Sequence, residues 1–309
     1  MPDRKFTEIR FCGKTFSSPL VLPSGIFTTL NDFKNARNHG AGAVTTKSYT
    51  YYPRRGHAAP VVVKYGQGFI NSVGLRNLGI SEAKKQITEF RKNLDLPVIV
   101  SIFDTKIKDF CQLILHLLPL KPRFIELNLS CPNVEDDFGK PLATGSQSAY
   151  EVVKMVKELV SDDTKIIAKL SPNVVSIKDI AKAVEEAGAD AISAINTVGP
   201  GMLIDIKAKK PMLGAGFGGV SGPAIKPIAL KCVFDIYETV NLPIIGMGGV
   251  TSWQDAVEML LAGATLVGVG SALYLQGMKA FTEINGGIGN YLRENNYQAL
   301  SDIIGLAHE

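Results

Sequence analysis

The sequence predicts one α/β domain over residues 1–309, built as a (β/α)8 barrel, and three observations support this. Short apolar runs rich in Val and Ile alternate with longer segments of helical period, as in parallel strands joined by helices. Eight such runs occur, and eight βα units close a barrel, with a doubly wound sheet as the alternative. No Pro/Ser-rich linker or charge block divides the 309 residues, which are 46% hydrophobic and 20% charged.

The eight strands are expected, in order, at Leu20–Pro23, Ala43–Thr46, Pro97–Ser101, Phe124–Asn128, Lys165–Leu170, Ala189–Ile195, Pro243–Gly246 and Thr265–Val269. The candidate helices begin with Ser or Pro, and several end near Gly, as capping chemistry favours: Ser81–Asn93, Ser146–Val160, Ser176–Ala187, Pro223–Thr239 and Ser252–Ala262. Two segments rich in Gly and Pro, Tyr49–Phe69 and Thr197–Val220, break the alternation. Both follow strands, so we expect loop or hairpin excursions over the C-terminal face, where barrel active sites lie.

Composition excludes several classes of protein. The net charge of +4 is mild and spread out, which argues against a dedicated nucleic-acid binder. The aromatic and basic residues of Tyr49–Arg55 fit a loop edge or a subunit contact better than a surface for stacking bases. No apolar h-region follows Met1–Lys5 and no apolar run reaches membrane-spanning length, so we expect a cytoplasmic protein without a membrane partner. The cysteines and histidines lack metal-ligand spacing, so we expect no metal site.

Polar or glycine residues stand at the carboxyl end of every predicted strand. Such residues would fill a core poorly, but they suit strand ends that converge on a polar ligand. They are Ser24-Gly25, Lys47-Ser48, Ser101, Asn128, Lys169, Asn196-Thr197, Gly248-Gly249 and Gly270-Ser271.

Glycines after the last two strands predict a phosphate site. Gly248-Gly249 follows the seventh strand and Gly270-Ser271 the eighth, and barrels often bind phosphate there. Gly222 directly precedes the Pro223 helix start and is a further candidate anion contact. The run Gly214–Gly219 fits G-x-G-x-x-G, but no strand ends at Gly214, so we interpret it as a flexible loop and not as a dinucleotide fingerprint.

Three residue types carry candidate chemistry. Cys131 leaves the fourth strand among Ser, Pro and Asn, so it is a candidate nucleophile or general base, whereas Cys12, Cys111 and Cys232 fit inert packing. Lys47 and Lys169 end strands and suit either Schiff-base chemistry or charge stabilisation of a reduced cofactor. Asparagine amides suit a planar ligand such as a pyrimidine, although Asn is also common in turns; the candidates are Asn71, Asn128, Asn133 and Asn196.

At this point the chain resembles the dihydroorotate dehydrogenases, flavin enzymes of pyrimidine synthesis. The resemblance runs from Pro23-Ser24-Gly25 to Gly270-Ser271-Ala272. The matching blocks between them are Thr46–Ser48, Asn71–Leu75, Asn128–Asn133, Lys169–Asn173, Ile195–Thr197, Gly219–Pro227 and Ile245–Gly249.

The resemblance implies an FMN-containing barrel that oxidises (S)-dihydroorotate to orotate. Cys131 would be the base that removes the C5 proton while a hydride passes from C6 to flavin N5, and a cysteine there is typical of class 1. The implied substrate contacts are Lys47, Asn71, Ser72, Val73, Gly74, Leu75, Asn128, Asn133, Asn196 and Thr197. The implied cofactor contacts are Ser24, Gly25, Lys47, Ser48, Ser101, Asn128, Lys169, Ile195, Gly222, Gly248, Gly249, Gly270 and Ser271.

The blocks Lys169–Asn173 and Gly219–Pro227 look like the 1B branch of this family. That branch implies a homodimer joined by an iron–sulfur/FAD electron-transfer subunit into a heterotetramer that passes electrons to NAD. Three other hypotheses stay open from the residues alone: a dihydropyrimidine-type oxidoreductase, a Schiff-base lyase using Lys47 or Lys169, and a non-catalytic barrel that binds an anionic metabolite.

Overall fold

The computed structural model describes residues 7–129 and 145–309, and within them eight parallel strands close into the predicted barrel. The strands are hydrogen-bonded in chain order, and the last pairs with the first. Most are buried along their whole length, because helices outside and side chains inside cover both faces of a parallel sheet. All eight predicted strands are confirmed: β3 (Leu20–Leu22), β4 (Ala43–Thr45), β7 (Val98–Ile102), β8 (Phe124–Asn128), β9 (Lys165–Leu170), β10 (Ala191–Ala194), β15 (Ile244–Met247) and β16 (Leu266–Gly268).

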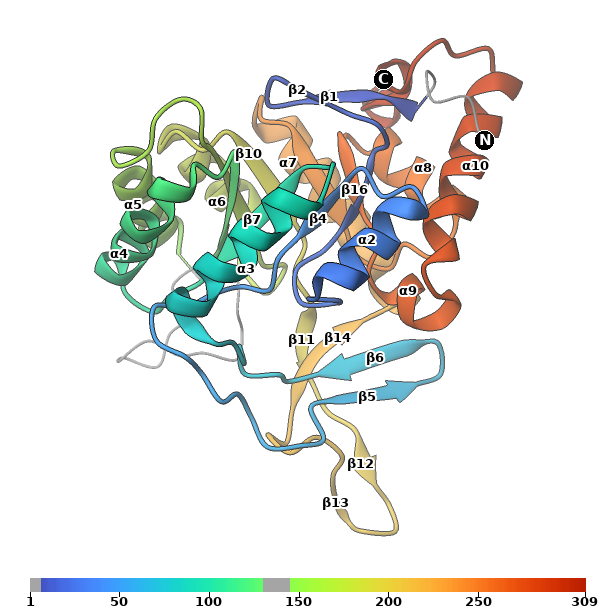
Figure 1. The fold of residues 1–309 in the computed structure, drawn as a ribbon. Helices are drawn as coiled ribbons and strands as arrows, with labels where there is room; N and C mark the ends of the chain where they lie inside the picture. The colour runs from blue at the N-terminus through green and yellow to red at the C-terminus, as the bar shows by residue number, and fades with distance from the viewer. Residues whose placement is uncertain (1–6, 130–144) are drawn as a thin grey trace.

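Helices surround the barrel (Figure 1). Ser176 and Ser252 are N-caps, as predicted, and each accepts the backbone N–H three residues on. The helices are α2 (Leu30–Asn38), α3 (Gly79–Asn93), α4 (Ile107–Leu117), α5 (Ser146–Lys157), α6 (Ile177–Glu186), α7 (Lys226–Thr239), α8 (Trp253–Leu261), α9 (Ser271–Gln276) and α10 (Lys279–Glu294). Short 3₁₀ turns are η1 (Leu118–Leu120), η2 (Pro223–Ile225), η3 (Leu300–Ile303) and η4 (Leu306–His308). Across the described ranges, no helix is both long enough and apolar enough to cross a bilayer.

A hairpin of β1 (Ile9–Phe11) and β2 (Lys14–Phe16) covers the amino-terminal end of the barrel. Phe11 and Phe16 meet edge to face with ring centroids 5.7 Å apart, and both pack on Phe124 at the start of β8. The three rings are buried and pack together at the end of the barrel that the hairpin covers. Figure 1 shows this hairpin above the barrel strands.

The two excursions combine into one antiparallel sheet beyond the carboxyl ends of the strands (Figure 1). Its order is β11 (Val198–Gly201), β14 (Gly218–Ser221), β6 (Gly68–Asn71) and β5 (Val62–Tyr65). The interpretation of Gly214–Gly219 as a loop was therefore wrong at its end, because Gly218 and Gly219 begin β14. A Cβ on Gly218 would lie 2.3 Å from the Asn71 carbonyl oxygen, and one on Gly219 would lie 2.0 Å from Thr197 Oγ1. The glycines are needed for this close strand packing.

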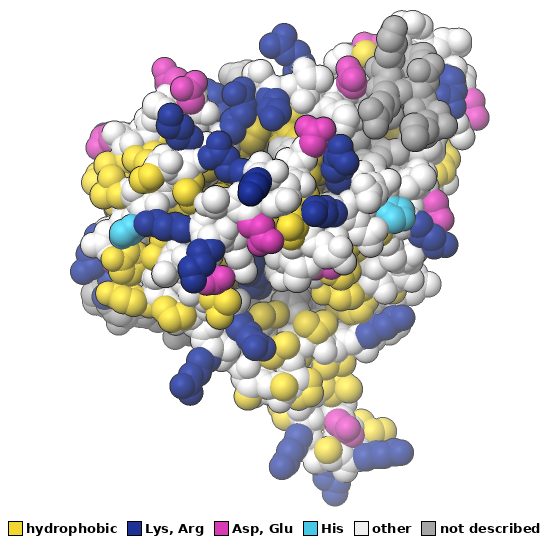
Figure 2. Space-filling view, viewed as in Figure 1, with side chains coloured by type: hydrophobic (Ala, Val, Ile, Leu, Met, Phe, Trp, Pro, Cys, Tyr) yellow, Lys and Arg dark blue, Asp and Glu magenta, His cyan; other side chains and the backbone are white. Residues whose placement is uncertain are grey.

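A second hairpin, β12 (Ile204–Asp205) and β13 (Lys210–Pro211), projects away from the barrel (Figure 1). Ile204 and Ile206 are exposed on it, together with Lys207 and Lys209. Figure 2 shows the basic side chains gathered on this projection below the rest of the surface. The hairpin thus presents an apolar and basic surface outside the barrel.

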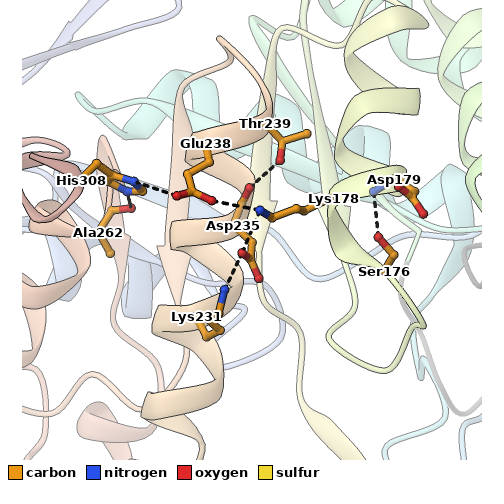
Figure 3. A network of polar contacts seen from close by, with 9 residues as sticks. All are labelled: Ser176, Lys178, Asp179, Lys231, Asp235, Glu238, Thr239, Ala262 and His308. Atoms are coloured by element: carbon orange, nitrogen blue, oxygen red, sulfur yellow. Dashed lines mark hydrogen bonds and ion pairs between the residues drawn. The ribbon is translucent and has the colours of Figure 1, made fainter.

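The C-terminus is tied to α7 through His308 (Figure 3). The His308 ring stacks on Phe234 at a centroid distance of 3.7 Å, and its Nε2 bonds the carbonyl oxygen of Ala262 at 3.1 Å. Glu238 lies 3.9 Å from His308 and accepts from Lys178 of α6 at 2.9 Å. This network joins α6, α7 and the last residues of the chain.

Candidate functional site

A cavity opens between the carboxyl ends of the barrel strands and the four-stranded sheet. Most of the described residues expected to bind a ligand line it, although they come from strands far apart in the sequence. These are Ser24, Gly25, Lys47, Ser48, Asn71, Val73, Gly74, Leu75, Asn128, Lys169, Ile195, Asn196, Thr197, Gly222, Gly248, Gly249, Gly270 and Ser271.

Two lysines bring positive charge into this cavity. Lys169, in β9, is 5% exposed, and its ammonium makes no hydrogen bond or ion pair with any other described residue. Lys47 passes over the bare backbone of Gly25, where an added Cβ would lie 3.1 Å from its Nζ. A buried ammonium is costly unless a ligand meets it. The cavity is therefore suited to a polar or anionic group beside Lys169.

Glycines with positive φ form one wall of the cavity. Gly222 (φ +103°) precedes η2, and Gly248 (+132°) and Gly249 (+78°) follow β15. An added Cβ on Gly249 would lie 2.8 Å from the backbone nitrogen of Lys226, so the loop rests directly on the first turn of α7. Backbone N–H groups and helix starts gathered in this way suit a phosphate, as the sequence predicts.

The carboxylate of Asp255 holds the loop after β15 against the start of α7. Asp255 Oδ2 accepts the backbone N–H groups of Thr251 and Ser252, each at 2.9 Å, while its Oδ1 accepts from Lys226 Nζ at 2.7 Å. Burial by itself would raise the pKa of Asp255, but the Lys226 ammonium and the backbone donors hold it below the usual value. One side chain thus joins the loop after β15 to the start of α7.

Hydroxyl groups form a chain that leads down from the cavity. Ser24 Oγ lies 3.3 Å from Ser48 Oγ, and Ser48 Oγ lies 2.9 Å from Ser101 Oγ. Asn128 Nδ2 donates to Ser48 Oγ at 3.2 Å. Ser101 is fully buried and is not among the cavity-lining residues, although the resemblance implies a cofactor contact there. Its hydroxyl instead donates to Glu126.

Two of the asparagines that the resemblance implies as substrate contacts lie at or near the four-stranded sheet, because Asn71 ends β6 and Asn196 lies two residues before β11. Asn71 Nδ2 donates to the Gly219 carbonyl at 3.3 Å, and Asn196 Oδ1 accepts the Thr197 N–H at 2.8 Å. These bonds fix two of the predicted amides at the cavity. Ser72 does not line the cavity, because its hydroxyl is buried against His57 Nδ1 at 2.8 Å.

Cys131 and Asn133 lie outside the described residues, but the other three cysteines can be placed. Burial raises the pKa of Cys12 to about 12, reinforced by Asp190, and that of Cys232 to about 11. Burial also raises the pKa of Cys111 on α4. These three thiols are therefore held protonated, as inert packing residues should be.

Several lining residues were not among the predicted contacts. Tyr274 on α9 donates to the Ile26 carbonyl at 3.0 Å and packs against Phe69 of β6. Both partners lie far from Tyr274 in the sequence, so these contacts could not be predicted from it. The other lining residues that were not predicted are Pro23, Val62, Ser221, Ile225, Met247, Val250 and Gly268.

Comparisons with known proteins agree with this geometry. Residues 6–292 match the family described as dihydroorotate dehydrogenase. Three similar relatives carry the name dihydroorotate dehydrogenase B (NAD(+)), catalytic subunit. They come from Pyrococcus abyssi (45% identical, covering 97% of this chain and 98% of the relative), Methanocaldococcus jannaschii (42%, 98% and 98%) and Methanosarcina mazei (41%, 99% and 96%).

Proposed function

This chain belongs to the dihydroorotate dehydrogenase family, and from that premise we propose that it oxidises (S)-dihydroorotate to orotate in pyrimidine biosynthesis, with FMN as cofactor. The match over residues 6–292 carries the proposal. The cavity supports it, because glycine backbone, two lysines and several amides meet at one barrel mouth.

The residues present fit FMN. Gly222, Gly248 and Gly249 offer a backbone cradle for its phosphate, joined by Gly270 and Ser271 at the start of α9. The ring and ribityl chain would lie against the remaining cofactor residues: Ser24, Gly25, Lys47, Ser48, Asn128, Lys169 and Ile195. The ammonium of Lys169, whose side chain is only 5% exposed, would then meet a partner and stabilise negative charge that develops beside it.

Substrate oxidation removes a proton from C5 and a hydride from C6 of the dihydropyrimidine. FMN, when bound, supplies the acceptor for that hydride at N5. Cys131, as thiolate, would take the C5 proton, which leaves the C5–C6 double bond of orotate. The substrate carboxylate and ring amides would contact Lys47, the 71–75 loop, Asn128, Asn133, Asn196 and Thr197.

The electrons must then leave the protein. The relatives named above are catalytic subunits of an NAD-linked enzyme. We propose the same arrangement here: a homodimer of this chain that binds an iron–sulfur/FAD subunit and passes electrons to NAD, in the cytoplasm.

A dye-linked assay tests the function without the partner subunit. Protein saturated with FMN should form orotate from dihydroorotate with an artificial electron acceptor, and it should not oxidise dihydrouracil, which lacks the carboxylate. Cys131→Ala should abolish turnover while FMN stays bound. Oxidation of dihydrouracil in preference to dihydroorotate would move the substrate to another reduced pyrimidine. Full activity of Cys131→Ala would refute the assignment of the base.

A further inference from the structure

Glu126 is a buried carboxylate inside the barrel to which the proposed reaction gives no role. It is 2% exposed and lies on β8, two residues before Asn128. Residues two apart on a strand share a face, so Glu126 lies beneath Asn128, about 7 Å deeper in the barrel. A carboxylate at this depth must be satisfied by hydrogen bonds.

Two serine hydroxyls satisfy it. Ser101 Oγ donates to Glu126 Oε1 at 2.9 Å, and Ser193 Oγ donates to Oε2 at 3.0 Å. Both serines are 0% exposed. Ser101 is the residue opposite Glu126 in the β7–β8 ladder, and its backbone N–H is held by Thr46 Oγ1. The carboxylate is therefore fixed between strands on its two sides.

The carboxylate determines the direction of the hydroxyl chain. A serine hydroxyl has one proton, and Ser101 uses it on Glu126. The 2.9 Å contact between Ser48 and Ser101 then requires Ser48 to donate. With its proton committed, Ser48 Oγ can only accept from Asn128, so the Asn128 amide must face it with Nδ2 and not with Oδ1. The two orientations of an amide are nearly isosteric, so a committed acceptor beside it selects between them.

We propose that Glu126 is a positioning residue for the cavity: through Ser101 and Ser48 it fixes the amide orientation of Asn128. The proposal deepens the proposed function, because the orientation of Asn128 decides whether a donor or an acceptor faces the pyrimidine or the flavin. Ser101 thus acts on Asn128 from below the cavity, as one member of the chain of hydroxyl groups.

Two matched variants test the proposal. Ser101→Ala and Ser193→Ala each remove one buried hydroxyl bond to Glu126, but only Ser101 leads to Ser48. We expect the side-chain amide NMR signals of Asn128 to move in Ser101→Ala and to stay unchanged in Ser193→Ala, in the protein as purified. Orotate affinity of the FMN-loaded protein should fall about tenfold in Ser101→Ala and less than about twofold in Ser193→Ala.

A double-mutant cycle separates positioning from general destabilisation. If Ser101 acts through Asn128, Ser101→Ala should cause no further loss of orotate affinity in an Asn128→Ala background. Equal effects of the two serine variants on the Asn128 signals, or no effect of either, would overturn the proposal. The proposal would also be overturned if Ser101→Ala caused its full loss of orotate affinity in the Asn128→Ala background. Failure of the wild type to bind orotate would instead refute the proposed function, and the NMR comparison would still decide whether the path from Glu126 through Ser101 orients Asn128.

Discussion

Gly249→Ala should disrupt the cavity wall formed by Gly222, Gly248 and Gly249, where the FMN phosphate is proposed to bind. The effect should be far larger than that of an alanine at a comparable glycine elsewhere. Gly249 has a φ of +78°, and its Cβ would lie 2.8 Å from the Lys226 nitrogen and 2.9 Å from the Lys226 Cα. Because these are backbone atoms, the loop or the start of α7 must move. Gly216 has a similar φ of +85°, but no atom of the described residues lies within 4 Å of an added Cβ, which makes Gly216→Ala the matched control.

The magnitudes follow from these two situations. Placing a side chain in the left-handed region costs about 1–2 kcal/mol, which is the whole cost expected at Gly216. Overpacking against a rigid neighbour adds about 1–3 kcal/mol at Gly249, so its total is about 2–5 kcal/mol. Displaced N–H donors should also weaken FMN binding about tenfold to hundredfold in Gly249→Ala alone.

Urea unfolding of the two variants without FMN measures the stability cost, and quenching of FMN fluorescence on titration measures the affinity. We expect Gly216→Ala to bind FMN as the wild type does. Equal unfolding free energies and equal FMN affinities for the two variants would refute the reasoning, since the close approach to Lys226 would then have no energetic effect.

Three further predictions concern other parts of the chain. Lys226→Met removes the largest of the causes that lower the pKa of Asp255, so it should weaken FMN binding. It should also reduce the part of the unfolding free energy that this carboxylate contributes above pH 3.8 and that the wild type loses as the pH falls below it, and urea unfolding across the acid range measures this. At about pH 8, iodoacetamide should label Cys131 before the other three cysteines, whose pKa values are raised by burial, as peptide mass spectrometry would show. His308→Ala removes the Phe234 stack and one hydrogen bond, so it should lower the unfolding free energy by about 1–2 kcal/mol without changing FMN affinity.

Each of these predictions has a contradicting result. Lys231→Met, which breaks a more exposed ion pair on the same helix, is the control for Lys226→Met. Equal effects of the two variants on FMN affinity and on stability would contradict the role of the Lys226–Asp255 pair in holding the loop after β15. Faster labelling of Cys232 than of Cys131 would contradict the thiol assignment. A stability of His308→Ala equal to that of the wild type would mean that the C-terminus adds nothing to α7.

The barrel could be predicted from the sequence because its signals are local. The runs at Phe124–Asn128 and Lys165–Leu170 coincide with β8 and β9 residue for residue. The buried strands are mostly apolar segments followed by a polar or glycine residue, and both features appear within a few residues. Because the strand ends were predicted correctly, most of the predicted ligand contacts next to them do line the cavity.

Contacts between distant segments could not be predicted in this way. Gly218 and Gly219 have the composition of a loop. Gly218 pairs with Gly201 of β11, and Gly219 pairs with Asn71 of β6 some 150 residues earlier, which depends on the barrel being closed. Glu126 reads as one polar residue in an apolar strand, and its partner Ser193 comes from a strand that lies 67 residues later. Ser101 was placed at a strand end correctly, but only the geometry shows that its hydroxyl points to Glu126.

An anaerobic visible spectrum, recorded on the FMN-loaded protein before and after adding dihydroorotate, tests the central claim most directly. If this chain is a dihydroorotate dehydrogenase with FMN in the cavity, the flavin absorbance should bleach, and orotate should appear in an amount equal to the flavin reduced. A flavin band that stays unchanged in fully loaded protein, or a protein that cannot take up FMN, would contradict the account.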